Sequence, residues 1–139
     1  MSETAAPSAV IEGQQSPVGT VTVSRVVDVP VDQVWKAFNT KAGVEALLGP
    51  GAMLGGKGEH WRSSEGTHGV LRSYHPLEQI RVSWHADEDA PKTLVDIHLA
   101  AEGASTQIAL EHQNIDPRDS EALQERWVAA LDRVVATID

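Results

Sequence analysis

The feature that most constrains the fold is a series of segments in which apolar and polar residues alternate. One long segment with apolar residues at helical spacing follows them. Between residues 79 and 113, apolar and polar side chains alternate in consecutive segments that short turns separate. Such alternation is typical of strands that bury one face of an antiparallel sheet. The segments are Gln79–Trp84, Thr93–Ala101 and Thr106–Gln113.

The C-terminal part of the chain predicts its longest helix, from about Pro117 or Ser120 to Ile138. Asp116 followed by Pro117 is typical of a helix start. A helix with a continuous apolar face must bury it, and the sheet offers the only large surface. We therefore expect an α+β fold in which this helix lies on a curved antiparallel sheet. The stripe comprises Leu123, Trp127, Ala130, Leu131, Val134 and Ile138, widened by Val128 and Val135.

The preceding part predicts one strand, two short helices and further strands. Alternation predicts a strand over Thr20–Val29, with Arg25 on the inward face unless a register slip turns it outward. Val31–Phe38 has the spacing of an amphipathic helix, and Thr40 can cap a second one that Gly49–Pro50–Gly51 ends. Further strands are expected near Ala52–Gly58, where the signal is weak, and over Glu59–Ser63 and His68–Tyr74.

The domain organisation follows from length and local composition. Residues 1–19 are rich in Ser, Thr, Pro, Gln, Gly and Ala, so we expect a disordered tail. Residues 20–139 have the length of one domain, which we expect to bind a ligand. No segment has the composition of a signal peptide or a membrane span, so we expect a cytoplasmic protein that does not insert into membranes.

Charge and cysteine content exclude several kinds of function. The chain has 20 acidic and 11 basic residues and a net charge of -9, which argues against nucleic-acid binding. It has no cysteine, which excludes a thiol nucleophile, a Cys-ligated zinc site and an iron–sulfur centre. No nucleophile elbow or pair of facing carboxylates is evident. We therefore assign no catalytic residue, metal or cofactor, and leave open whether the protein is an enzyme.

Two weak signals for ligand chemistry are not adopted. Gly51–Gly58 approaches a phosphate-binding loop, but Gly58 stands where Ser or Thr would bind Mg²⁺, and no buried parallel strand precedes it. Asp96 and His98 share a strand face and have the spacing of two metal ligands. That face is predicted to be the outer one, so solvated side chains are the favoured interpretation.

The candidate binding residues are polar and aromatic side chains that face the space under the helix. His112 is in line with Ile108 and Leu110, so it either hydrogen-bonds a buried partner or meets a ligand. Arg72 and Tyr74 share a strand face whose orientation the pattern leaves ambiguous. Four of the six aromatic residues are Trp. We expect Trp35 in the core and the others around the enclosed space, namely Trp61, Trp84 and Trp127.

The order of these features resembles the START-like, or SRPBCC, superfamily, and within it the branch named for an activator of a heat-shock protein's ATPase. Small bacterial members of this branch are often called polyketide cyclase-like. The resemblance rests on the strand entering Pro30, Val34–Trp35, the strand start at Gly69, the stretch Pro76–Trp84, the strand Thr106–His112, and Trp127. It implies the helix-grip fold, in which a curved antiparallel sheet wraps around a long C-terminal helix and leaves a cavity. Many relatives have a Trp where the second helix ends, whereas this chain has Leu47–Leu48, so we expect a differently shaped pocket mouth.

The leading hypothesis is the binding of a hydrophobic or amphipathic small molecule of lipid, polyketide or aromatic type. Trp61, Trp84 and Trp127 would form the wall of the cavity. His112, with Arg72 or Tyr74, would orient the polar end of the ligand.

The resemblance adds alternatives to binding. One is a cyclase or aromatase that positions its substrate, with His112 or Tyr74 as proton shuttle. Another is a co-chaperone-like or regulatory module whose acidic surface meets a basic protein partner. Relatives also include stress and resistance proteins.

Overall fold

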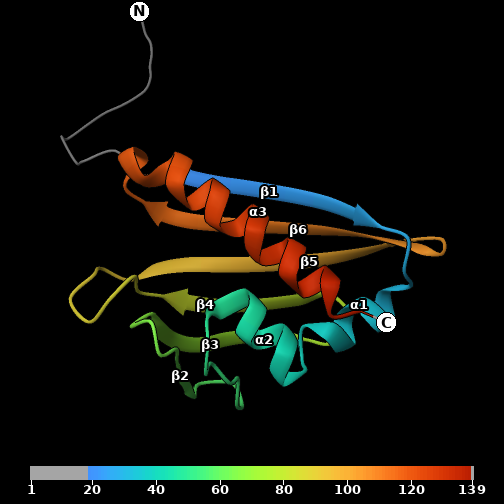
Figure 1. Ribbon diagram of the computed structural model, residues 1–139, viewed down its shortest axis with the longest axis horizontal. Helices are drawn as coiled ribbons and strands as arrows, with labels where there is room; N and C mark the ends of the chain where they lie inside the picture. Colours follow the sequence, from blue (N-terminus) through green and yellow to red (C-terminus); the bar gives the residue numbers. More distant parts are fainter. Residues whose placement is uncertain (1–18, 139) are drawn as a thin grey trace, which may run out of the picture.

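The structure is a computed structural model that describes residues 19–138. Its elements follow the order that the sequence predicts: a strand, two short helices, a series of strands and one long helix (Figure 1). The elements are β1 Gly19–Val27, α1 Val31–Ala37, α2 Lys41–Leu48, β2 His60–Arg62, β3 His68–His75, β4 Gln79–Trp84, β5 Thr93–Glu102, β6 Ser105–Ile115, the 3₁₀ turn η1 Pro117–Asp119, and α3 Ser120–Ala136.

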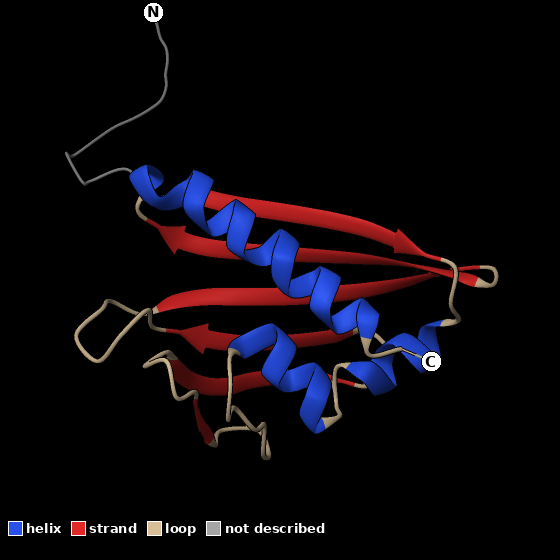
Figure 2. Ribbon diagram, in the orientation of Figure 1, coloured by secondary structure: helices blue, strands red, loops and turns tan. Residues whose placement is uncertain are grey.

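The strands form one six-stranded sheet in the order β1-β6-β5-β4-β3-β2. Every neighbouring pair is antiparallel. The helices lie on one face of this sheet, with α3 crossing it diagonally and α2 beside α3 (Figure 2). The predicted α+β helix-grip fold is confirmed, including the long C-terminal helix on an antiparallel sheet.

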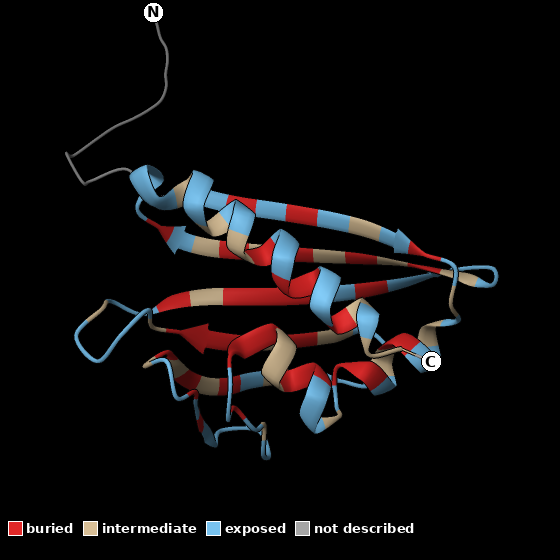
Figure 3. Cartoon of the chain, in the orientation of Figure 1, coloured by how far each residue is buried: buried red, intermediate tan, exposed pale blue. Residues whose placement is uncertain are grey.

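The core lies between α3 and the sheet. Trp127, Ala130, Leu131 and Val134 of α3 are at most 1% exposed, and so are Ile108 and Leu110 of β6. Buried and exposed residues alternate along β1, as expected for a strand with one covered face (Figure 3). Each large apolar side chain buried in this way contributes roughly 2 kcal/mol. These side chains lie between the helix and the sheet, where the sequence predicted a cavity.

Polar contacts also link α3 to its neighbours. Arg25 of β1 forms an ion pair with Asp132 of α3. Of the two orientations that the sequence allows for Arg25, the structure therefore has the one that faces the helix. The guanidinium of Arg133 donates to the backbone oxygen of Ala46 in α2 at 3.1 and 3.3 Å. These contacts tie the helix to β1 on one side and to α2 on the other.

Three local predictions need correction. β1 ends at Val27, because the chain bends before Pro30 to enter α1. Phe38 lies just after α1 as its C-terminal cap and is still only 1% exposed. The weak strand predicted over Ala52–Gly58 is wrong: the segment is irregular, because its glycines give a strand little side chain to pack.

Gly69 shows why the start of β3 requires glycine. A Cβ atom at this position would lie 1.8 Å from the backbone oxygen of Ser83 on β4. The same oxygen accepts a hydrogen bond from Trp61 Nε1 at 3.2 Å. The absence of a side chain at Gly69 therefore lets Trp61 reach across β3 to β4.

The predicted tail, residues 1–19, lies outside the described residues except for Gly19, which begins β1. Its disorder and the domain boundary at residue 20 stay predictions. Among the helices of residues 19–138, none is both long enough and apolar enough to cross a membrane. The cytoplasmic location also stays a prediction.

Candidate functional site

A pocket of about 510 Å³ opens where the first turns of α3 face the ends of three strands. This volume is within the range of small-molecule sites. The aromatic and apolar part of the wall comes from Trp84 at the end of β4, Ile115 at the end of β6, and Leu123 of α3. The rest of the wall comprises Ala86, Ala90, Pro91, Thr93, His112, Asn114, Asp116, Arg118, Asp119, Ala122 and Arg126.

A second pocket, of about 590 Å³, lies between α2 and α3. Its wall is made of alanines, Gly49, Pro50 and four charged residues, without an aromatic side chain. The charged residues are Glu45, Glu65, Arg126 and Arg133. Arg126 thus borders both pockets, and the aromatic surface belongs to the pocket at the strand ends.

Next to Trp84 in the pocket wall, His112 is held by two hydrogen bonds. Trp127 Nε1 donates to His112 Nδ1 at 3.0 Å. Thr93 Oγ1 donates to the backbone oxygen of Trp84 at 2.7 Å and lies 2.7 Å from His112 Nε2. Because the Thr93 hydroxyl hydrogen is already used, His112 Nε2 must be the donor in the second bond. The network therefore assigns a neutral ring with its proton on Nε2.

The electrostatic surroundings agree with this assignment. His112 is fully buried in the core. Burial, and secondly the positive charge of Arg126, lower the pKa of His112 from 6.5 to about 4. The ring therefore stays neutral at pH 7, with both nitrogens committed to internal partners. Of the two roles that the sequence allows for His112, the structure shows hydrogen bonds to buried partners.

Arg126 and Trp84 form the boundary of the pocket next to this network. Arg126 Cζ lies 5.2 Å from the centre of the Trp84 ring and 5.7 Å from that of Trp127. These distances are typical of cation–π contacts. Trp84 packs edge-on against His112 and Trp127, with ring centres 4.9 and 5.8 Å apart. The aromatic rings thus hold a guanidinium at the pocket.

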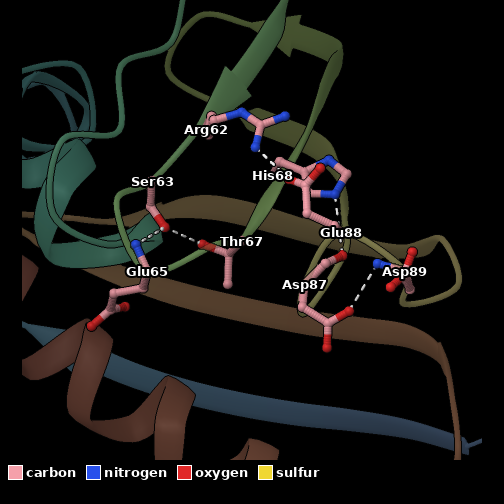
Figure 4. A network of polar contacts seen from close by, with 8 residues as sticks. All are labelled: Arg62, Ser63, Glu65, Thr67, His68, Asp87, Glu88 and Asp89. Atoms are coloured by element: carbon pink, nitrogen blue, oxygen red, sulfur yellow. Dashed lines mark hydrogen bonds and ion pairs between the residues drawn. The ribbon is translucent and has the colours of Figure 1, made fainter.

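The loop between β4 and β5 forms another side of the pocket and is anchored to β2 and β3. His68 Nε2 contacts the backbone oxygen of Asp87 at 3.2 Å, and Arg62 pairs with Glu88 (Figure 4). His85 Nδ1 contacts the backbone oxygen of Ala90 at 2.9 Å, and its ring stacks on His68 at 4.5 Å. The acidic residues of this loop, Asp87, Glu88 and Asp89, are exposed. Its anchors hold Ala86, Ala90 and Pro91 at the pocket.

The structure brings together three of the six residues predicted for the site. Trp84 and His112 line the pocket, and Trp127 lies directly behind them. Trp61 is buried in the core and does not line this pocket.

Arg72 and Tyr74 lie away from the pocket. The register between β3 and β4 shifts between Leu71 and Ser73, so the strand has a bulge at Arg72, which is exposed. Tyr74 then pairs with Ile80 at the far end of β4, where its hydroxyl donates to Asn39 Oδ1 at 2.6 Å. Its ring packs against Trp35 of α1. The bulge explains why alternation left this strand ambiguous.

Sequence reasoning missed Thr93, Arg126 and Asn114 as parts of the site. Arg126 lies three residues after Leu123 on α3, and this helical spacing could have placed it beside the apolar stripe. Asn114 has φ 66°, a left-handed conformation that Asn adopts more readily than most residues. Nothing local in the sequence distinguishes Thr93, because its role depends on His112 of the neighbouring strand.

Asp96 and His98 were predicted to be solvated on the outer face of the sheet, and this is wrong for Asp96. Asp96 is only 1% exposed, although it lies on the outer face. Arg81 Nε and Gln79 Nε2 each donate to its carboxylate at 2.9 Å, and His98 Nε2 lies 3.3 Å away. Neighbouring long side chains therefore cover this carboxylate and use its oxygens. Within residues 19–138, no group of three or more potential ligands is placed to hold a metal ion.

The sheet order and the long helix over the sheet define a protein of the START-like, or SRPBCC, superfamily. Within it, the chain belongs to the family of Activator of Hsp90 ATPase homolog 1-like proteins, whose family model matches residues 28–139. The resemblance inferred from the sequence is confirmed. A search among curated proteins finds no match.

Solved structures with the same fold have low sequence identity. CalU16 from Micromonospora echinospora is 22% identical with a TM-score of 0.75, and the match covers 90% of this chain and 85% of that one. DynU16, from the dynemicin biosynthetic locus, is 18% identical with a TM-score of 0.72, covering 84% of this chain and 46% of that one. Aha1 of Colwellia psychrerythraea, solved as a dimer, is 15% identical with a TM-score of 0.70, covering 86% of this chain and 96% of that one. At these identities the likeness shows the fold alone.

Proposed function

We propose that the protein binds a small amphipathic molecule in the pocket at the strand ends. The observation that carries this proposal is the combination of an aromatic and apolar wall with two arginines, of which Arg118 pairs with Asp116 and Arg126 lies against the aromatic rings. Trp84, Ile115 and Leu123 offer contact to a flat or aliphatic body, and Arg126 offers a polar anchor. Pockets of this composition are typical of small-molecule sites.

Membership of the family and the fold shared with a protein from a biosynthetic locus support a ligand of aromatic or polyketide type. CalU16 and DynU16 have the same fold, and DynU16 comes from a biosynthetic locus. The pocket of about 510 Å³ has room for a fused-ring molecule. An aromatic ligand would also stack against Trp84, which already packs edge-on with its neighbours.

The geometry favours binding over proton transfer at His112. Both ring nitrogens of His112 have internal partners, and its pKa is lowered to about 4. A proton shuttle needs a nitrogen within reach of the substrate and a pKa near the working pH. Tyr74, the other shuttle candidate, bonds to Asn39 at the opposite end of β4. A cyclase that works by positioning alone is compatible with this pocket and stays the alternative.

A titration with lipids, flavonoids and aromatic polyketides tests the proposal. We expect quenching or a shift of Trp fluorescence, and NMR shifts at Trp84, Ile115 and Leu123. Shifts confined to other parts of the molecule, or no binding by any of these classes, would contradict it.

Two matched helix variants separate the two pockets. Ala122 and Ala129 are exposed positions of α3 that line the pocket at the strand ends and the pocket between α2 and α3, respectively. We expect Ala122→Trp to fill the first pocket and weaken binding by about tenfold or more, which corresponds to about 1.4 kcal/mol. Ala129→Trp should leave the affinity unchanged. The opposite result would move the site to the pocket between the helices.

A protein partner, the third hypothesis from the sequence, is compatible with the family match but has no specific contact surface to support it. Binding of a basic partner by the acidic surface would depend strongly on salt. A pull-down at low and high salt therefore distinguishes it from pocket binding.

A further inference from the structure

The guanidinium of Arg126 is incompletely satisfied. Its side chain is 34% exposed, and its ion-pair contact with Glu65 is long, 4.0 Å between Nη2 and Oε1. The guanidinium also lies over the rings of Trp84 and Trp127. A guanidinium carries five N–H donors and no acceptor, so most of its hydrogen-bonding capacity is free for a ligand.

A second donor in the same wall has no acceptor. Trp84 Nε1 is buried and has no hydrogen-bond partner among the described residues. A buried N–H without a partner is costly, and native structures contain few of them. Because Trp84 lines the pocket, an acceptor atom of a bound molecule that reaches Nε1 would relieve this cost.

The acidic residues at the rim are separated from Arg126. Asp116 pairs with Arg118, with 3.1 Å between Oδ2 and Nε. Asp119, just before α3, is seven residues from Arg126, which is about 10 Å along a helix axis. This separation is about one Debye length at 0.1 M salt. Arg126 is therefore separated from the two aspartates of this wall, one of which is already paired with Arg118.

We propose that the ligand of this pocket is an acid, whose carboxylate or phenolate oxygen pairs with Arg126 and accepts a hydrogen bond from Trp84 Nε1. This inference rests on the proposed function, because it names the chemical class of the bound molecule. Arg126 binds a planar anion with parallel N–H donors. Glu65 would be displaced from Arg126 by the ligand, so this carboxylate acts as an internal competitor.

Three probes of matched shape test the proposal: 2-naphthoate, 2-naphthamide and 2-naphthylmethylamine. Their affinities are measured by calorimetry, and the four Trp indole N–H signals are followed by NMR. We expect the acid to bind about tenfold more tightly than the amide, with the amine weakest. The indole signal that disappears in Trp84→Phe should shift downfield with the acid.

Charge variants identify the recognising residue. Arg126→Gln should remove the preference for acid over amide, and Arg126→Lys should keep part of it. Arg72→Gln is the matched control, because Arg72 is an exposed arginine of β3 that does not line the pocket. Glu65→Gln should strengthen binding of the acid about twofold, by removing the competing carboxylate, and leave the amide unchanged.

The outcomes separate this inference from the proposed function. Equal binding of acid and amide at the pocket, or tighter binding of the amine, overturns the acid assignment and leaves small-molecule binding in place. Loss of preference in Arg72→Gln but not in Arg126→Gln also overturns it. Absence of binding by all three probes and by the wider panel overturns both.

Discussion

At the scale of single residues, His112 shows how burial and hydrogen bonding determine what a side chain can do. Its Nδ1 accepts from Trp127 and its Nε2 donates to Thr93. Moving the ring proton to Nδ1 would place two N–H groups against each other at Trp127, so the tautomer is fixed. His112, the main polar candidate from the sequence, thus supports the aromatic wall, and the proposed anchor of the ligand is Arg126.

Replacing Thr93 tests this network. Thr93→Val keeps the side-chain shape but removes the acceptor for His112 Nε2–H and the donor to the Trp84 oxygen. We expect a loss of about 2 kcal/mol in the free energy of unfolding, because a buried donor is left without a partner. Urea denaturation measures it. Thr22→Val, at an exposed position of β1, should have little effect; equal stability of the two variants would refute the network.

At the scale of elements, the β4–β5 loop is a wall of the pocket that side chains hold in place. His85 bonds to Ala90 across the loop, and His68 bonds to Asp87. The two imidazole rings stack within 2° of parallel. The acidic residues of the loop are exposed, so its order depends on these few contacts rather than on burial.

Removing the His85 side chain should loosen this loop. His85→Ala eliminates the bond to Ala90 and the stack on His68, whereas the backbone bonds between positions 68 and 85 remain. We expect amide hydrogen exchange over residues 86–92 to rise about fivefold, equivalent to about 1 kcal/mol. Exchange measured by mass spectrometry should show no change in α3.

The matched control for the loop is Arg62→Gln. Arg62 and Glu88 form an exposed ion pair, with side chains 63% and 64% exposed. Exposed pairs contribute little, so exchange in the loop should be almost unchanged. Unchanged exchange in His85→Ala would mean that backbone contacts alone hold the loop.

At the scale of the whole molecule, stability should depend on pH through His112. Its pKa is about 4 in the folded protein and close to 6.5 when unfolded. Between these values the unfolded chain binds more protons, so the free energy of unfolding falls as the pH drops from 6.5 to 4. This difference corresponds to about 3 kcal/mol. Denaturation curves at a series of pH values measure the slope.

Two His variants assign this slope. His112→Gln offers an amide acceptor and donor to the same partners but has no titrating group, so the profile between pH 6.5 and 4 should flatten. His60 is exposed on β2, and His60→Gln should retain the wild-type slope. A wild-type slope in His112→Gln would show that other groups cause the acid sensitivity.

The sequence predicts some residues of the site and not others, depending on how regular the backbone around each residue is. Trp84 and His112 were found from alternation, since each lies on a regular strand with a buried face. Arg72 and Tyr74 could not be oriented, because a bulge between Leu71 and Ser73 breaks the alternation. Arg126 was missed because a charged residue at the edge of an apolar stripe resembles any solvated helix position.

The sequence by itself determined the kind of elements and their order, because strand and helix periods follow from local backbone geometry. It thereby determined a sheet with one buried face and the helix that covers it. Only the tertiary structure decided where the pocket lies and which polar groups meet there. Strand register and the packing of α3 on the sheet bring Trp84, Thr93, His112 and Arg126 together from four elements. Contacts between residues so far apart depend on the packing of the whole chain, which no local pattern records.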